Sequence, residues 1–364
     1  MKNPVACIFA HVSRTLLGLV FLFSGSVKAI DPLGTTYKIE DYLKAFGGFF
    51  TDLLPLAQTA AFVLIALEFV LGVCLVLNIR PRLTSWLTLV FYLVMTPLTL
   101  YIAIQNPVSD CGCFGDAVIL TNWQTFWKNV VLLTLAVVWL CTRKSAPGRW
   151  IWQAEAVISL LAIGAVAGFM VWTLHHLPVM DFRPYKVGNN LPALMEYPDD
   201  AEQDVYEVTF VYAKDGVEQT FTLENYPKGD STWTFVSQQS KLIKKGYEPP
   251  IHDLDILNAE DENITDDLLG SEEPVTLVIM YDLRKTEKSN LDRIAAWQAE
   301  NKHYLTGSGT DDILAFCLEH PLFDAEDFCT CDPVTLKTIV RANPGIVVLQ
   351  NGVVQAKFNA RDWK

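Results

Sequence analysis

The chain has 364 residues and a formal net charge of −13, a length that allows one to three domains. The charge is unevenly distributed. Residues 1–178 carry 11 Lys and Arg against 8 Asp and Glu, a net of +3, and residues 179–364 carry 17 against 33, a net of −16. The acidic half lacks the basic surface that binding to a phosphate backbone requires, which argues against nucleic acid as a partner.

Five apolar runs in the first half are long enough to cross a bilayer as helices, which takes about 20 residues each. They cover residues 6–30, 54–79, 84–106, 124–142 and 150–177. The first run is too long for a signal peptide and lacks a small-residue cleavage site, so we interpret it as a retained helix in the lipid membrane.

Basic residues near the helix ends predict the orientation in the membrane. They cluster in three segments, namely Lys2, Arg80 with Arg82, and Arg143 with Lys144 and Arg149. These segments belong on the cytoplasmic side. We therefore expect a bacterial inner-membrane protein with a cytoplasmic N-terminus. The loop at 107–123 and everything after the fifth run are expected in the periplasm.

Two Cys-x-Cys pairs fall on the expected outer side, Cys111 with Cys113 in "CGCFGD" and Cys329 with Cys331 in "FCTCDP". A disulfide between cysteines one residue apart closes a strained ring that is readily reduced, which suits thiol exchange better than stabilisation of a fold. A plain structural disulfide and binding of a soft metal ion stay open as alternatives. No convergent His or Met set accompanies the pairs, so we expect no metal.

The first pair lies in a glycine-rich turn. Gly112 and Gly115 allow the loop to turn tightly close to the membrane surface. We expect Phe114, between them, to insert into the helical bundle.

Glu68 lies inside the second run, where a carboxylate is costly without a partner. At about 1.5 Å per residue, Arg14 lies about 13 Å and Glu68 about 16 Å from the cytoplasmic ends of their helices, so we expect them to pair. The pair either fixes the register of the two helices, or it anchors the head group of a quinone-like cofactor or serves a proton step.

Residues 10–142 resemble the DoxX and MauE group of small membrane proteins. The resemblance rests on "GLVFLFSGSVKAIDPLGTTYKIEDYL", the glutamate in the second run and "CGCFGD" before the fourth. It implies four core helices. MauE-type members are associated with maturation of a disulfide-rich periplasmic methylamine dehydrogenase subunit, and DoxX-type members with quinol-linked redox chemistry. This chain adds a fifth helix and a large C-terminal region.

The segment after the fifth run begins with a predicted hairpin. "VYEVTFVYA" and "VEQTFTLEN" alternate as strands around "KDG". Residues 232–246, "TWTFVSQQSKLIKKG", are predicted as a short helix closed by Gly246.

From residue 248 the predicted order of elements is β-β-α-β-α-β-α-β-β. The strands are expected at 251–257, 274–282, 303–307, 321–327, 344–352 and 353–358, and the helices at 289–301, 310–320 and 332–343.

This order and "RANPGIVVLQNGVV" resemble a thioredoxin-like fold over residues 248–362. The resemblance implies a cis peptide at Pro344 beside an active site, and a Cys-x-x-Cys after the central strand. That segment here is "YDLRKTEKSN", which has no cysteine. Cys329 and Cys331 follow a neighbouring strand and are expected at the same edge of the sheet.

The sequence thus predicts a multi-domain protein with an α-helical transmembrane bundle and a C-terminal α/β domain. The predicted segments are a four-helix membrane domain at 1–145, a fifth helix at 146–178, a connecting region at 179–247 and a thioredoxin-like domain at 248–364.

Three functions stay open. The first is a thiol–disulfide oxidoreductase that relays electrons between the two Cys-x-Cys pairs and acts on periplasmic client proteins, with a quinone as the candidate cofactor. Attachment through the fifth helix would make that exchange intramolecular. The second is a membrane-anchored binding or assembly module without catalysis. The third is a quinol-linked redox subunit that uses Arg14 and Glu68.

Overall fold

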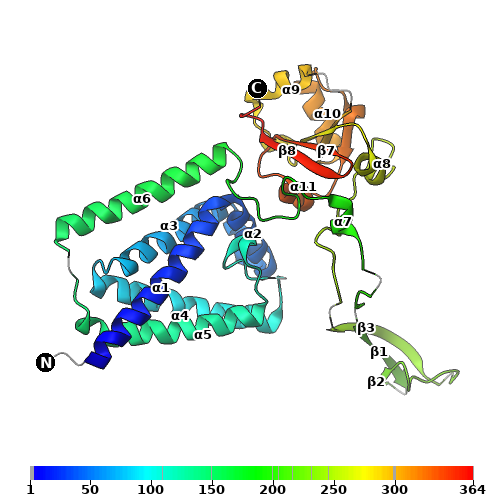
Figure 1. Cartoon of the computed structure of the whole chain (residues 1–364). Coiled ribbons are helices and arrows are strands. Elements are labelled where there is room, and N and C mark those ends of the chain that lie inside the picture. The colour runs from blue at the N-terminus through cyan, green and yellow to red at the C-terminus, as the bar shows by residue number, and fades with distance from the viewer. Residues whose placement is uncertain are drawn as a thin grey trace.

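The computed structural model describes residues 4–108, 110–148, 150–198, 200–203, 205–214, 216–230, 232–244, 246–297 and 301–363, without the side chains of residues 241, 242 and 244. Lys2 and Arg149, on which the predicted orientation partly depends, lie outside the described residues, as do residues 298–300 of the predicted helix 289–301. Figure 1 shows a helical bundle, a small projecting sheet and a C-terminal α/β domain.

Among the described residues, five helices are long and apolar enough to cross a membrane, which confirms the five predicted runs as candidate spans. They are α1 (Pro4–Ile30), α3 (Ala57–Val76, continuous with the 3-10 turn η1, Gly48–Leu56), α4 (Pro81–Gln105), α5 (Asn122–Thr142) and α6 (Trp152–His175). The sixth helix of this half, α2 (Pro32–Phe46), begins directly after α1.

Helices α1 and α3 pack closely because glycines line their contact. A Cβ atom on Gly18, Gly25 or Gly72 would come within 3 Å of the opposite helix, against Val76, Phe69 and Leu22 respectively. Small residues of this kind let two membrane helices approach. Helix α4 packs along α5, whereas α3 and α4 contact each other only sparsely.

The connecting region contains the short helix α7 (Leu191–Met195) and a three-stranded sheet with the order β2-β1-β3. The predicted hairpin is confirmed as β1 (Val205–Lys214) and β2 (Val217–Thr222). The predicted helix at 232–246 is wrong, because β3 (Thr234–Lys244) pairs antiparallel with β1 along its length. This pairing overrides the helix-forming Gln and Lys residues.

The C-terminal domain has a five-stranded sheet with the order β6-β5-β4-β7-β8. Strands β4, β5 and β6 run parallel, and β7 and β8 are antiparallel to their neighbours. The strands are β4 (Val275–Ile279), β5 (Lys302–Thr306), β6 (Phe328–Thr330), β7 (Gly345–Gln350) and β8 (Val353–Asn359). The helices are α8 (Thr265–Gly270), α9 (Leu291–Ala296), α10 (Thr310–Glu319) and α11 (Pro333–Ile339).

Two strand predictions in this domain are wrong. Residues 251–257 form only isolated bridges through Leu257, and the strand predicted at 321–327 is replaced by β6. The reason is that Phe328 and Cys329 fill the hydrophobic cores on opposite faces of the sheet, whereas residues 321–327 contain three carboxylates.

Two features of the last hairpin are confirmed. The Asn343–Pro344 peptide is cis, and it directly precedes Gly345, which pairs with Ile279 at the end of β4. The turn between β7 and β8 uses Asn351 and Gly352, both with positive φ, as hairpin turns of two residues require.

Candidate functional site

The loop between α4 and α5 is fixed at both ends by its own sequence. Asn106 ends α4 in the left-handed conformation. Thr121 begins α5 and forms a capping box with Gln124, which satisfies two otherwise free backbone N–H groups. The Asn122 side chain joins the two ends by donating to the Asn106 side chain at 2.7 Å and to the Val108 carbonyl at 2.9 Å.

Between these ends the chain turns so tightly that the Sγ atoms of Cys111 and Cys113 lie 3.0 Å apart. Gly112 and Gly115 have φ values of +63° and +54°, a region that glycine adopts at no steric cost. The N–H of Gly112 donates to the Asp110 side chain at 2.8 Å. The turn therefore places both sulfur atoms together.

Helix α2 covers this loop. Lys38 forms an ion pair with Asp110 at 2.9 Å, and the hydroxyl of Tyr42 donates to the Cys111 carbonyl at 2.8 Å. A Cβ on Gly112 would lie 2.8 Å from Cγ of Lys38. No larger residue fits between the two cysteines while α2 stays in place.

Beneath the loop a cavity of about 180 Å³ opens inside the helical bundle. Both cysteines and Gly112 belong to its lining, and the rest combines apolar side chains, among them Phe21, Leu64, Phe91, Met95 and Phe114, with polar side chains of the surrounding helices. Phe114 packs edge-on against Phe23 at 5.3 Å and thus enters the bundle as predicted. The cavity is lined from both α3 and α4.

A buried ion pair adjoins the cysteines in the cavity wall. The Nζ atom of Lys28 lies 2.8 and 2.9 Å from the two carboxylate oxygens of Glu68, and both residues are at most 6 % exposed. The Ser24 hydroxyl lies 2.7 Å from Glu68 and 2.9 Å from the Cys113 carbonyl. Ser24 therefore connects the ion pair to the cysteine loop.

The predicted pair between Arg14 and Glu68 is wrong. Arg14 donates to the carbonyl oxygen of Val76 at 2.8 Å and to that of Leu75. Gly18 already faces Val76, so Arg14 lies beside the last turn of α3. Counting residues from the helix ends did not detect that α1 and α3 are shifted along each other, so that Arg14 lies beside the end of α3 and not beside Glu68. The spacing of Ser24 and Lys28, one helical turn apart, is the sequence feature that could have revealed the partner of Glu68.

The surroundings of the two thiols favour a thiolate at Cys113. The hydrogen bond from Cys111 lowers the pKa of Cys113 to about 6 despite its burial, and Lys128 and Lys28 act in the same direction. The same hydrogen bond, followed by burial, raises the pKa of Cys111. Since the thiolate is the nucleophile in thiol exchange, Cys113 is the more reactive of the two.

We expect the rate at which Cys113 reacts with iodoacetamide to reach half its maximum near pH 6. Because the pKa is lowered, the thiolate is present above that pH and is lost as the pH falls through it. Peptide mass spectrometry of the reduced protein gives the rates. Cys329 and Cys331 serve as internal controls that should stay unmodified up to about pH 9. A midpoint near 9 for Cys113 would contradict the described geometry.

The second Cys-x-Cys pair lies in a different environment. Cys329 in β6 and Cys331 just after it are 4 % and 8 % exposed in the hydrophobic core. Burial, together with nearby carboxylates, raises the pKa of Cys329 to about 11 and that of Cys331 to about 12. Among the described residues, no contact joins these cysteines to Cys111 or Cys113. The structure does not bring the two pairs together.

The apolar helices and the loop that they hold define an integral membrane domain. Residues 6–142 match the family described as "Methylamine utilisation protein MauE", so this part of the chain is similar to the membrane proteins of that family. Residues 206–245, which include most of the three-stranded sheet, match a domain of unknown function, DUF8463. No curated protein and no solved structure matches the chain.

Proposed function

We propose that this protein is a membrane-bound thiol–disulfide oxidoreductase whose Cys111–Cys113 pair exchanges electrons with a lipid-soluble quinone. One observation carries the proposal. The two sulfur atoms lie 3.0 Å apart in the wall of an apolar cavity inside the helical bundle. Two thiols so close together can form a disulfide with little movement, and the cavity is accessible to an apolar acceptor.

Oxidation of Cys111 and Cys113 needs only the quinone as electron and proton acceptor. Oxidation of the two thiols forms one S–S bond and yields two electrons and two protons. A bound quinone supplies a two-electron, two-proton acceptor and leaves as hydroquinone. Cys113 enters the reaction as the thiolate after its proton has passed to water, from which the quinone takes up one proton, and Cys111 supplies the second sulfur and the second proton. The disulfide is then reduced by thiols of exported proteins, which become disulfide-bonded in turn.

The residues of the cavity fit a quinone head group. An apolar cavity of about 150 Å³ in another protein takes up benzene, so about 180 Å³ has room for one substituted ring. Lys28, Lys128 and Asn129 belong to the lining and offer hydrogen-bond donors for ring oxygens. Few polar groups in a mostly apolar pocket are typical of cofactor sites.

For the C-terminal region we propose a thioredoxin-like domain that binds client proteins without thiol chemistry of its own. The order of its sheet and the cis peptide before Pro344 support the fold. The turn after β4 has no cysteine, and the burial and raised pKa of Cys329 and Cys331 oppose reactivity. The distribution of Lys and Arg supports a location of this domain on the outer side of a bacterial inner membrane.

Filling the cavity tests the proposal. Met95→Trp places a larger side chain in the lining, and Val94→Trp is the matched control because Val94 is 59 % exposed on the lipid-facing side of the same helix. We expect Met95→Trp to raise the KM for a short-chain quinone at least about tenfold, or roughly 1.4 kcal/mol of binding, in a thiol-dependent reduction assay. The control should leave the KM unchanged. Equal KM values in both variants would place the acceptor elsewhere.

A further inference from the structure

We propose that α2 is a lid over the Cys111–Cys113 pair and that the C-terminal domain holds the lid closed through Arg341. The inference rests on the proposed function, because it describes how substrate thiols gain access to that pair. Its evidence is the set of contacts on the two sides of α2, the nature of those contacts and the backbone at the end of the helix.

The lower side of α2 lies against the cysteine loop. Lys38 forms an ion pair with Asp110 and lies close to Gly112. The Tyr42 hydroxyl donates a hydrogen bond to the Cys111 carbonyl. In this position α2 covers the loop, and the two cysteines are only partly exposed.

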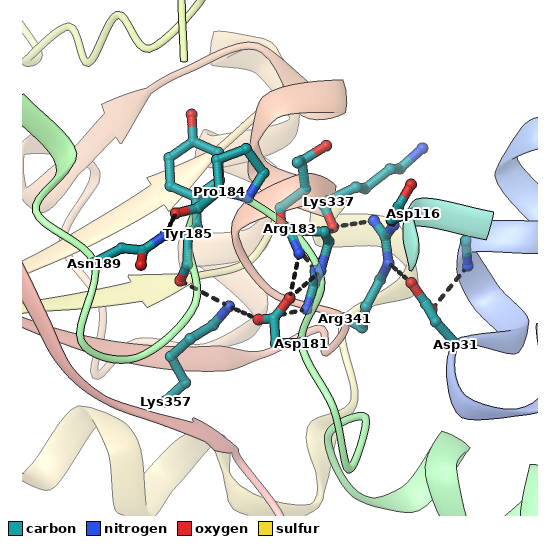
Figure 2. A network of polar contacts seen from close by, with 12 residues as sticks. Asp31, Asp116, Asp181, Arg183, Pro184, Tyr185, Asn189, Lys337, Arg341 and Lys357 are labelled. Atoms are coloured by element: carbon teal, nitrogen blue, oxygen red, sulfur yellow. Dashed lines mark hydrogen bonds and ion pairs between the residues drawn. The ribbon is translucent and has the colours of Figure 1, made fainter. Parts of the chain in front are cut away.

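The upper side of α2 lies against the C-terminal domain. Arg341, which is 7 % exposed, reaches the Asp31 carboxylate at 2.8 Å and that of Asp116 at 3.5 Å, as Figure 2 shows. Asp31 caps α2 by accepting from the Gly34 N–H at 2.9 Å, and Asp116 follows the cysteine loop. Arg341 thus connects the first turn of α2 and the loop between α4 and α5 to the C-terminal domain.

Aromatic contacts strengthen this attachment. The hydroxyls of Tyr37 and Tyr281 lie 3.2 Å apart. The Arg341 guanidinium and the Lys337 ammonium lie 5.3 and 4.8 Å from the centre of the Tyr37 ring, within the range of cation–π attraction. Tyr281 follows β4, so the lid meets the C-terminal domain at the edge beside the cis Pro344 peptide.

The segment between α6 and α7 is fastened to the C-terminal domain separately. Asp181 binds Arg183 at 2.8 Å and Lys357 at 2.7 Å, and Arg183 donates to the Thr338 carbonyl at 2.8 Å (Figure 2). This segment also lies beside the cysteine loop, and residues of both line a small cavity of about 30 Å³. The outer side of the loop is therefore covered, and this segment belongs to the C-terminal domain rather than to the lid.

The lid is attached by contacts that can be broken and remade. The attraction of a buried ion pair is largely offset by the loss of its hydration, so Arg341 holds α2 specifically but not permanently. Gly47 and Gly48 end the helix with positive φ, and a side chain at either position would contact nothing. They form a free hinge at the end opposite to Asp31.

A closed lid separates the two halves of the reaction. The acceptor reaches the cysteines through the cavity inside the bundle, while substrate thiols in water are kept out. Opening the lid admits a client at the outer side. Because α6 tethers the C-terminal domain to the membrane domain, Arg341 stays near Asp31 at a high effective concentration, and the lid can close again.

The test uses the full-length, reduced protein in lipid nanodiscs with a bulky, membrane-impermeant maleimide. Mass spectrometry follows the modification of the peptide that contains Cys111 and Cys113. We expect Arg341→Gln to speed this modification about tenfold, within the range of roughly 5- to 150-fold that is typical of coupling between two parts of a protein, and Arg341→Lys to restore part of the protection. Arg361→Gln is the matched control, because Arg361 binds Glu287 of the same domain away from α2.

Protection of Cys329 and Cys331 in the same spectra shows that the domain is still folded. If Arg341→Gln exposes them, Tyr37→Phe replaces it, with an expected increase of about threefold. Unchanged modification rates in a folded variant would overturn the lid. The labelling experiment does not depend on quinone reduction. If the oxidoreductase proposal alone fails, electron transfer to the quinone is absent, but Arg341→Gln is still modified faster than the wild type.

Discussion

Replacing Lys28 or Glu68 alone by Met is expected to destabilise the helical bundle by about 3–5 kcal/mol, because each change leaves one buried charge without its partner. The double variant Lys28→Met, Glu68→Met is expected to be close to the wild type in stability, since it removes both charges and fills the space. The free energy of unfolding, measured by denaturation in mixed micelles, gives the three values. Additive losses in the double variant would show that the two residues do not act as a pair.

The same double variant separates stability from function. It keeps the fold but removes both Lys28, which lowers the pKa of Cys113, and Glu68, which raises it. Because Lys28 has the larger of these two opposed effects, we expect the pH midpoint of Cys113 alkylation to move upward only slightly in a protein of normal stability. A downward shift would contradict this arrangement of charges.

Cys111→Ser and Cys113→Ser are each expected to reduce quinone-linked thiol oxidation to the background rate, because a single sulfur cannot form the disulfide. The two variants should still differ in reactivity. In Cys111→Ser the serine hydroxyl can donate to Cys113, which should keep a reactive thiolate near pH 7. In Cys113→Ser the remaining Cys111 should react slowly.

The control for these two variants is Cys329→Ala, Cys331→Ala. If the buried pair takes no part in the chemistry, this protein should oxidise thiols at the wild-type rate in the same assay. Loss of activity in this variant would support the hypothesis of a relay between the two Cys-x-Cys pairs. The sequence suggests that relay, but no contact among the described residues supports it.

Local sequence features predicted much of the fold. The apolar runs located all five long helices, and Asn351-Gly352 located the last hairpin, because length and turn chemistry are local properties. The helix prediction at 232–246 failed because β3 exists only through its pairing with β1. The secondary-structure preferences of residues 232–246 do not indicate a strand that pairs with them from about 30 residues away in the sequence.

The site was predictable to the same extent. The Cys111–Cys113 pair stands out in the sequence, and glycines on either side of Cys113 indicate the tight turn. The partner of Glu68 was missed because helix register depends on where Gly18, Gly25 and Gly72 let α1 and α3 approach. Likewise, the contact of Arg341 with Asp31 joins residues 310 positions apart, and no pattern along the chain indicates it.

A single-turnover experiment tests the central claim most directly. The reduced Cys329→Ala, Cys331→Ala protein is mixed without oxygen with one equivalent of a short-chain quinone in nanodiscs, and hydroquinone and disulfides are quantified. We predict one hydroquinone formed per chain, with a disulfide between Cys111 and Cys113. Absence of hydroquinone, or its formation without a disulfide at these two cysteines, would contradict the proposed function.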